Sequence, residues 1–346
     1  MVRKLLLFLL VIIYSNLNAQ YLNVDKPKKD TVIDYYLDVS NQLLVKLFTS
    51  RSYLQLEITN KESNDKIAIN PLGILNIGGS FNYKWIGIGV FLGLPSNEIE
   101  VSKKGKTSRL DLVLNVYNKR FLIDGFYQTY KGYHLANALT VAEWKSDTLP
   151  QFSDFRQKTL NITGFYIFNH NKFSLKSAFV RNVIQLKSAG SLIAGVFFNY
   201  DAANNSSGFL DNDSIKVDLK NKFPFTAFSS ITLGFSFGYS YNFVFSKCWY
   251  ANVTAAAGFG INQFNADTLY FDSLSILSNG SINKTNIGSI VLLRASVGYE
   301  KNNFIVGLNY IGNSRTINYN NYMIKPFSGN FRLFVAKRFG KKPLLN

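Results

Sequence analysis

The sequence predicts an all-β protein, a single antiparallel up-and-down transmembrane β-barrel. Stretches of roughly ten residues, long enough to cross a bilayer at a tilt, alternate between apolar and polar side chains. A period of two gives a strand one apolar and one polar face. Aromatic residues make up 15% of the chain, and many stand near the ends of these stretches, where membrane barrels carry aromatic girdles. Tight turns alternate with long polar segments, as in barrels with short turns on one side of the membrane.

Residues 1–19 have the pattern of a signal peptide. Arg3 and Lys4 are followed by an apolar run from Leu5 to Tyr14, and Ala19 precedes the expected cleavage before Gln20. The run is too short to span a bilayer, which takes about 20 apolar residues. No later run is long enough for a spanning helix, so the mature chain is expected in the outer membrane. Residues 20–41 are polar and predict a periplasmic linker.

The barrel is expected over residues 42–339, with a short tail at 340–346. The clearest strand is Ile231–Asn242, where Ile, Leu, Phe and Tyr alternate with Thr, Gly, Ser and Asn. A soluble sandwich also has such strands, but soluble strands average about five or six residues. We expect strands at 42–49, 51–60, 73–83, 85–94, 107–117, 120–130, 157–168, 172–182, 190–201, 229–242, 248–261, 289–300, 303–311 and 329–339.

The strand count carries a conflict. Long polar loops are expected at 95–106, 132–156, 202–228, 262–288 and 312–328. With the C-terminus in the periplasm, fourteen strands place most of these loops outside but put 132–156 on the periplasmic side. We therefore expect an even number of strands, about 12–14.

Charge and composition exclude several classes of protein. The formal net charge is +17, but the basic residues are spread singly along the chain, so nucleic acid is not an expected partner. A single Cys and two His make a metal site improbable, and we expect no cofactor. Lys104-Gly105-Lys106-Thr107 resembles the end of a phosphate-binding loop, but Glu100 stands where that motif requires Gly.

Candidate functional residues are the ionisable side chains on the polar faces of the strands. In a barrel these faces line the lumen, where such side chains either pair into a polar filling or form a charged path for a solute. His134, His170 and Cys248 have no catalytic spacing, and no catalytic residue is assigned. The lumen candidates are Glu57, Asp111, Asp124, Lys172, Lys176, Arg294 and Glu300.

Several short runs together resemble a known family. They are Tyr83-Lys84-Trp85, Lys104-Gly105-Lys106-Thr107 leading into Leu110-Asp111-Leu112, Tyr130-Lys131-Gly132-Tyr133, Lys187-Ser188-Ala189-Gly190-Ser191 and Gly238-Tyr239-Ser240-Tyr241. In order and spacing they are similar to an uncharacterised barrel family of Bacteroidota, domain-of-unknown-function family 4421, over about residues 35–339. The resemblance implies an outer-membrane location, and it implies no activity and no site residue.

The sequence therefore predicts a non-enzymatic outer-membrane barrel in contact with lipid, which passes or binds a small solute. The positive charge favours an anionic solute. Two alternatives stay open. One is a structural or assembly component that binds a protein partner through its long loops. The other is a lipid-modifying enzyme that uses His134 or His170.

Overall fold

The structure is a computed structural model that describes residues 35–84, 86–245, 248–271 and 276–340. The expected signal peptide, the linker as far as residue 34 and residues 341–346 of the expected tail lie outside the described residues. From Tyr35 onward the chain forms one unit. No helix in the described part of the chain is long and apolar enough to cross a membrane.

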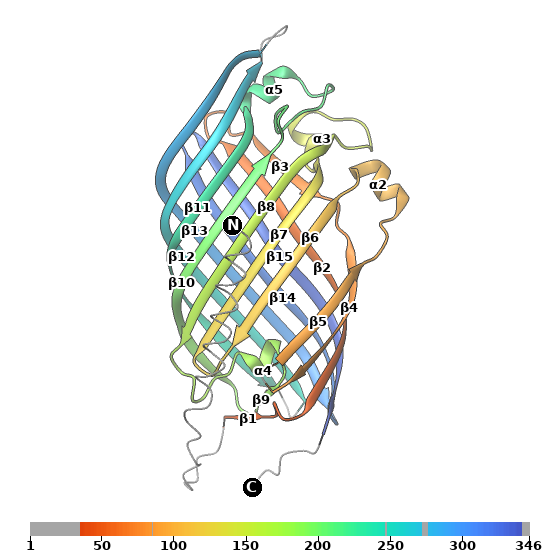
Figure 1. The fold of residues 1–346 in the computed structure, drawn as a ribbon, viewed down its shortest axis with the longest axis vertical. Coiled ribbons are helices and arrows are strands. Elements are labelled where there is room, and N and C mark those ends of the chain that lie inside the picture. The colour runs from red at the N-terminus through yellow and green to blue at the C-terminus, as the bar shows by residue number, and fades with distance from the viewer. Residues whose placement is uncertain (1–34, 85, 246–247, 272–275, 341–346) are drawn as a thin grey trace. The chain divides into compact units, whose positions relative to one another are not determined.

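The described chain is almost entirely β-structure, with a few short helices in its connections (Figure 1). The strands are β1(Tyr36–Asp38), β2(Leu43–Asn60), β3(Lys66–Pro71), β4(Leu75–Tyr83), β5(Ile86–Gly93), β6(Ser108–Tyr117), β7(Phe121–Leu135), β8(Gln151–Ile167), β9(Val183–Gln185), β10(Ala189–Asn204), β11(Phe225–Phe245), β12(Trp249–Phe271), β13(Ile276–Lys301), β14(Phe304–Tyr319) and β15(Tyr322–Phe339). The helices are α2(Glu98–Lys104), α3(Ala138–Val141), α4(Lys176–Phe179) and α5(Val217–Lys222).

The strands close into an antiparallel barrel, which confirms the predicted fold class. From β7 to β15 the barrel strands pair in chain order, β10 following β8, and β15 pairs with β2 along its whole length. Ten strands complete the ring: β2, β3, β7, β8, β10, β11, β12, β13, β14 and β15. We call the end with the connections 83–86, 117–121, 245–249 and 301–304 the turn end, and the opposite end the loop end.

The wall differs between these two ends. At the loop end β3 joins β2 to β7. Nearer the turn end, β4 pairs with β2, β5 pairs with β4, and β6 pairs with β7. Within the described residues β5 and β6 do not pair with each other. The turn-end half of the wall therefore contains twelve strands in place of ten, with an unpaired seam between β5 and β6.

Three of the expected strands are not separate strands of the wall. Residues 42–49 and 51–60 belong to the single strand β2, because the alternation continues through Ser50 without a turn. Residues 172–182 fold into helix α4 and the start of a connection, with Arg181 at φ 68°. With that segment out of the wall, the conflict over 132–156 disappears, because this loop lies at the loop end with the others.

Two expected loops are mostly strand. β12 continues to Phe271 and β13 begins at Ile276, so most of 262–288 is a paired hairpin. β14 and β15 likewise extend to Tyr319 and from Tyr322. Asn302 and Asn303, both at positive φ, form the tight turn between β13 and β14, as two-residue hairpin turns require.

The outer face is apolar along most of the wall. In β11 the predicted apolar face, from Ile231 to Tyr239, is exposed, and Thr232, Ser236, Ser240 and Asn242 are buried inside. Exposed apolar side chains also cover the outer faces of β10, β12, β13 and β15. A belt of this kind is suited to lipid.

The alternation reverses toward the loop end. In β2 the side chains of Leu54, Leu56 and Ile58 are fully buried inside the barrel, and Gln55 and Glu57 lie on the outer face. There the inward side chains join an apolar cluster with Phe155, Phe209 and Phe264, among others. This end therefore has the construction of a water-soluble barrel, and its apolar core closes the lumen from that side.

Candidate functional site

A plug closes the turn end of the barrel. It is the connection between β8 and β10, residues 168–188, which contains α4 and β9. Phe173, Leu175, Ala178 and Phe179 of this plug are buried against lumen side chains of the wall. Strand β9 pairs with β1, so residues 36–38, expected in a linker, are ordered against the plug.

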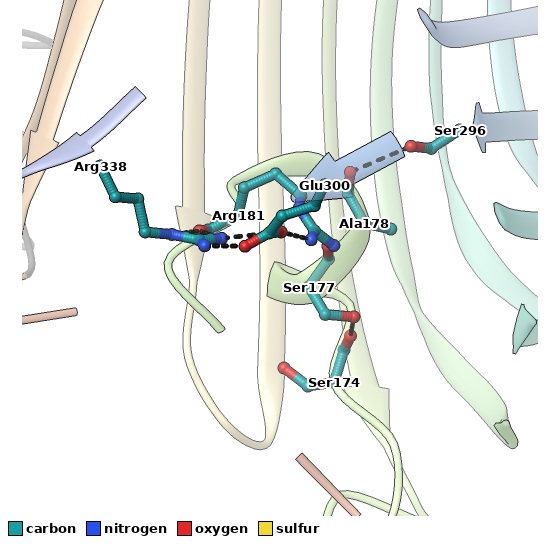
Figure 2. Close-up of polar contacts among 7 residues, drawn as sticks. All are labelled: Ser174, Ser177, Ala178, Arg181, Ser296, Glu300 and Arg338. Atoms are coloured by element: carbon teal, nitrogen blue, oxygen red, sulfur yellow. Dashed lines mark hydrogen bonds and ion pairs between the residues drawn. The ribbon is translucent and has the colours of Figure 1, made fainter. Parts of the chain in front are cut away.

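An ion-pair cluster holds the plug to the wall, as Figure 2 shows. Glu300, at the end of β13, accepts from the guanidinium groups of Arg181 in the plug and Arg338 in β15. Arg338 also donates to the backbone carbonyl of Arg181 at 2.8 Å. Because Glu300 and Arg338 belong to the wall and Arg181 to the plug, releasing the plug breaks a buried charge cluster.

Neutral hydrogen bonds complete the attachment. The Ser296 hydroxyl donates to the Ala178 carbonyl at 3.0 Å, as Figure 2 also shows. The Asn242 amide donates to the Ser174 carbonyl at 2.9 Å. Both wall residues are lumen-facing and buried, so the plug satisfies groups that would otherwise need water.

Cations outnumber anions beside the plug. Lys46 of β2 is buried, donates to the Phe179 carbonyl at 3.2 Å, and lies 5.0 Å from the centre of the Phe334 ring. The Arg332 guanidinium lies 4.5 Å from the centre of the Phe48 ring, and its Nε is buried without a hydrogen-bond partner in the described chain. The guanidinium groups of Arg181, Arg332 and Arg338 lie near the Lys46 side chain, and Glu300 is the carboxylate paired with Arg181 and Arg338.

Charges in the middle of the lumen are balanced. Asp124 pairs with Arg294, and both side chains are almost fully buried. Asp201 pairs with Arg315 at 2.8 Å, and Arg315 also donates to Ser328 at 2.9 Å. These pairs form a polar filling between the apolar cluster at the loop end and the plug, so the described state has no charged path along the barrel axis.

A small cavity lies within this filling, on the lumen side of β6 and β7. Val113, Phe126 and Ile311 give it an apolar side, and Ser52, Gln128 and Asn330 a polar side. Arg332 is the next inward-facing residue of β15 after Asn330. The cavity therefore adjoins the cationic region.

The predicted lumen residues take several positions. Asp124 and Arg294 come together, and Asp111 accepts from Gln128 and Tyr130, each at 2.8 Å. Glu300 lies in the plug cluster. Glu57 lies on the outer face and pairs with Lys66 at 2.7 Å, because the alternation of β2 is reversed there. Lys172 and Lys176 lie in the plug, and the Lys172 ammonium is 5.4 Å from the centre of the Tyr35 ring.

Sequence reasoning missed Lys46, Arg181, Asp201 and Arg315 as lumen residues. Lys46 stands between Val45 and Leu47, whose outward direction would have placed it inside. Arg332 and Arg338 face away from the apolar side of the final strand, so the alternation of that strand predicts that they face the lumen. The position of Arg181 could not be predicted in this way, because the plug is not a strand and has no alternating faces.

The two histidines lie at opposite ends of the barrel. His134 is buried near the end of β7 at the loop end, and His170 lies in the plug at the turn end. Burial and the nearby Lys119 and Arg120 lower the pKa of His170. Among the described residues, no group of three His, Cys, Asp or Glu side chains is arranged to hold a metal ion.

Comparison with known proteins identifies a family. The family described as "Domain of unknown function (DUF4421)" matches residues 28–339, and no curated protein sequence matches. The outer membrane protease OmpT of Escherichia coli is similar at 8% identity and a TM-score of 0.40, over 88% of this chain and 98% of that one. The Pseudomonas putida toluene transporter TodX is similar at 7% identity and a TM-score of 0.22, over 87% and 91%. No activity is transferable at these values.

Proposed function

The chain belongs to this family, and we propose that it is an outer-membrane barrel that binds a small anionic solute in the turn-end half of its lumen, behind the plug. The cation excess beside the plug carries the proposal: Arg181, Arg332 and Arg338 lie near Lys46, and Glu300 is the carboxylate that pairs with Arg181 and Arg338. A buried charge without a counter-charge is costly. An anion bound beside Arg332 supplies that counter-charge.

The direction of the barrel follows from its loops. Barrels of outer membranes have short turns on the periplasmic side and longer loops outside. The turn end carries the short connections and the C-terminal end of β15. We place this end, with the plug and the anion site, at the periplasm and the apolar cluster outside. The exposed apolar belt then lies in lipid.

A non-enzymatic role is part of the proposal. His134 and His170 lie at opposite ends of the barrel, so no pair of imidazoles could act on one substrate. The anion site itself consists of cations and aromatic rings, Phe48 and Phe334. Binding of an anion is the function that such groups support.

The proposal is tested by phosphate binding, measured by isothermal titration calorimetry. Phe179→Ala thins the plug and leaves every charge in place, since Phe179 is a buried apolar plug residue. The apolar cluster still closes the loop end in this variant, so we expect easier entry of phosphate from the turn end and no ion conduction. Adding Arg332→Gln or Lys46→Met should weaken phosphate binding, and Lys66→Gln on the outer face should not.

A second readout uses the wild-type barrel. Inorganic phosphate should raise the melting temperature of the wild-type barrel, because a ligand of the folded state stabilises it by mass action. The rise should be smaller in Arg332→Gln. Phosphate binding and a thermal response that are unchanged in both Arg332→Gln and Lys46→Met would contradict an anion site.

A further inference from the structure

The seam between β5 and β6 is a break in the wall at the level of the lipid-facing belt. β5 is paired only with β4, and β6 only with β7, over the described residues. Figure 1 shows both strands on the same side of the barrel, next to their single partners. Unpaired strand edges are unfavourable in hydrocarbon, where no water can satisfy them. A membrane protein that keeps such edges is expected to use them.

The seam ends at a defined point on the loop side. Arg109, the second residue of β6, donates across the seam to the Ile74 carbonyl at 3.2 Å and to the Asn76 side chain. Beyond this crossing, Thr107 donates to the Gly132 carbonyl at 2.6 Å and accepts from the Leu72 amide at 2.8 Å. These hydrogen bonds connect the wall on the loop-end side of Arg109, so the unpaired seam is confined to the turn-end half.

Side chains along the seam are apolar on the outer face of the wall. Val90 and Leu92 of β5 are 73% and 79% exposed, and Leu110, Leu112 and Leu114 of β6 are exposed on the outer face. Val113 faces the lumen yet is 45% exposed. Inward residues elsewhere in the wall, such as Ser236, are fully buried. The lumen is thus accessible from the side at β6.

The access leads to the cavity and to Arg332. Val113 lines that cavity together with Phe126 and Ile311. Asn330 also lines it, and Arg332 is the next inward residue of the same strand. A path from lipid therefore passes three apolar side chains and ends near a guanidinium that lacks a carboxylate partner in the described chain.

We propose that the seam is a lateral access route from the bilayer, and that the anion is a single-chain amphiphile with a carboxylate head. The head binds Arg332 and the tail lies against Val113, Phe126 and Ile311. This inference rests on the proposed anion site and names the class of anion that it takes. β5 and β6 run antiparallel, so they are able to pair with each other, and the unpaired arrangement is the one that admits the ligand.

Binding in lipid nanodiscs tests the ligand class. Dodecanoate is expected to bind wild-type protein about tenfold or more tightly than dodecanol, since the Arg332 contact is a charge-assisted hydrogen bond. It should also bind more tightly than hexanoate, which has the same head and a shorter tail. Arg332→Gln should remove the advantage over dodecanol, and Arg332→Lys should keep part of it.

Blocking the seam tests the route. Val113→Trp places a large ring at the seam and should reduce dodecanoate binding about tenfold. Leu233→Trp, on the lipid-facing side of β11, is the matched control and should bind normally. A folded Val113→Trp barrel that binds dodecanoate like wild type overturns the lateral route.

A photoreactive dodecanoate gives a readout that does not depend on any variant. Crosslinks in the wild-type barrel should concentrate on β6 and β7 at Val113 and Phe126. Labelling confined to the lipid-facing surface, at the level given by photoreactive dodecanol, overturns the proposal. If hexanoate binds as tightly as dodecanoate and both depend on Arg332, the anion site is supported and the amphiphilic ligand is wrong. If Arg332→Gln changes the binding of no anion, both proposals are wrong.

Discussion

Charged side chains inside the barrel differ in whether an opposite charge satisfies them. Asp201 and Arg315 are each 3% exposed and lie 2.8 Å apart, and Thr159 donates a further hydrogen bond to Asp201 at 2.8 Å. Arg332, in contrast, faces an aromatic ring and has an unpartnered Nε. The first arrangement fills the barrel and fixes its interior. The second leaves a charge available for a ligand.

Removing one partner of the buried pair should be costly. Asp201→Asn leaves the Arg315 charge without a carboxylate, and we expect a loss of about 3–5 kcal/mol in the free energy of unfolding. Glu57→Gln, in the outer pair with Lys66, should cost no more than about 1 kcal/mol. Urea unfolding from lipid vesicles measures both. Equal effects of the two substitutions would contradict the distinction.

The double variant Asp201→Leu with Arg315→Met separates charge from packing. Because both charges are removed together, most of the loss in Asp201→Asn should be recovered. If the double variant is as unstable as the single one, hydrogen bonds and shape at this position matter more than the ion pair.

At the residue scale the sequence predicted inward charges but not their partners. Asp124 and Arg294 were both expected in the lumen, yet they lie 170 positions apart in the chain, and alternation says nothing about which strands face each other across a barrel. Arg181 was assigned to a strand that does not exist. Its role depends on how the plug folds, and that is set by contacts with the finished wall.

At the scale of elements, the junction of β3, β6 and β7 determines where the seam begins. Gly132, at φ 89°, lies in a bulge of β7, where its partner changes from β6 to β3. A Cβ atom there would stand 2.1 Å from the Lys106 carbonyl oxygen. Two of the runs that carry the family resemblance, Lys104–Thr107 and Tyr130–Tyr133, therefore meet at this junction.

Substitutions at the junction should loosen it. Thr107→Val removes the donor to Gly132 and the acceptor for Leu72, both buried, so we expect a loss of roughly 1–3 kcal/mol. Gly132→Ala should be at least as destabilising because of its positive φ and its contact with Lys106. Thr140→Val, an exposed threonine in the α3 connection, is the control. Urea unfolding that shows no difference between Thr107→Val and Thr140→Val would contradict the role of the junction.

The connections at the loop end are joined by a pH-dependent ion pair. Asp65, in the turn after β2, pairs with Lys222 at the end of α5 at 2.8 Å. The hydrogen bond from Lys222 lowers the pKa of Asp65, and the same contact raises the pKa of Lys222. The carboxylate contribution is present above the unfolded pKa of Asp65 and is lost as pH falls through the lowered folded value. The lysine contribution is lost as pH rises through the raised value of Lys222.

A spin label on α5 detects this connection. In a Val217→Cys variant with Cys248→Ser, label mobility should increase as acidification protonates Asp65. Asp65→Asn should give the mobile spectrum at neutral pH and show no such acid transition. A label that stays immobile in Asp65→Asn would show that α5 is held by its other contacts, such as the hydrogen bond from Asn60 to the Lys222 carbonyl.

Element predictions held where alternation was regular and faced lipid. Ile231–Asn242 is part of β11 with the faces expected. The hairpin over 262–288 was expected to be a loop because its residues are largely polar. Polar residues also suit a paired strand whose outer side faces water. The segment 172–182 has alternating apolar residues because it is buried in the plug. Alternation alone does not distinguish that from a lipid-facing strand.

At the scale of the whole molecule, the reversal of the alternation marks where the barrel leaves the membrane. On β2 the outward side chain at Leu47 is apolar, and beyond Arg51 the outward positions are polar. On β8 the outward residues change from Ile162 and Leu160 to Lys158 and Arg156. The change occurs on both strands where the inward residues become apolar. The seam lies on the membrane side of this boundary, which a lateral route for an amphiphile requires.

A charge placed on either side of this boundary should have very different consequences. Phe235 is exposed within the apolar belt of β11, and Phe235→Arg should reduce the free energy of folding into a bilayer by about 2–4 kcal/mol. Gln55→Arg, on the outer face of β2 beyond the boundary, should cost close to nothing, and Phe235→Leu controls for the lost ring. Urea-dependent folding into lipid vesicles measures all three. If Gln55→Arg is as harmful as Phe235→Arg, the belt extends farther toward the loop end, and the apolar interior there is inside the membrane. If neither is harmful, the exposed belt does not face lipid, and a route from the bilayer to Arg332 has no source.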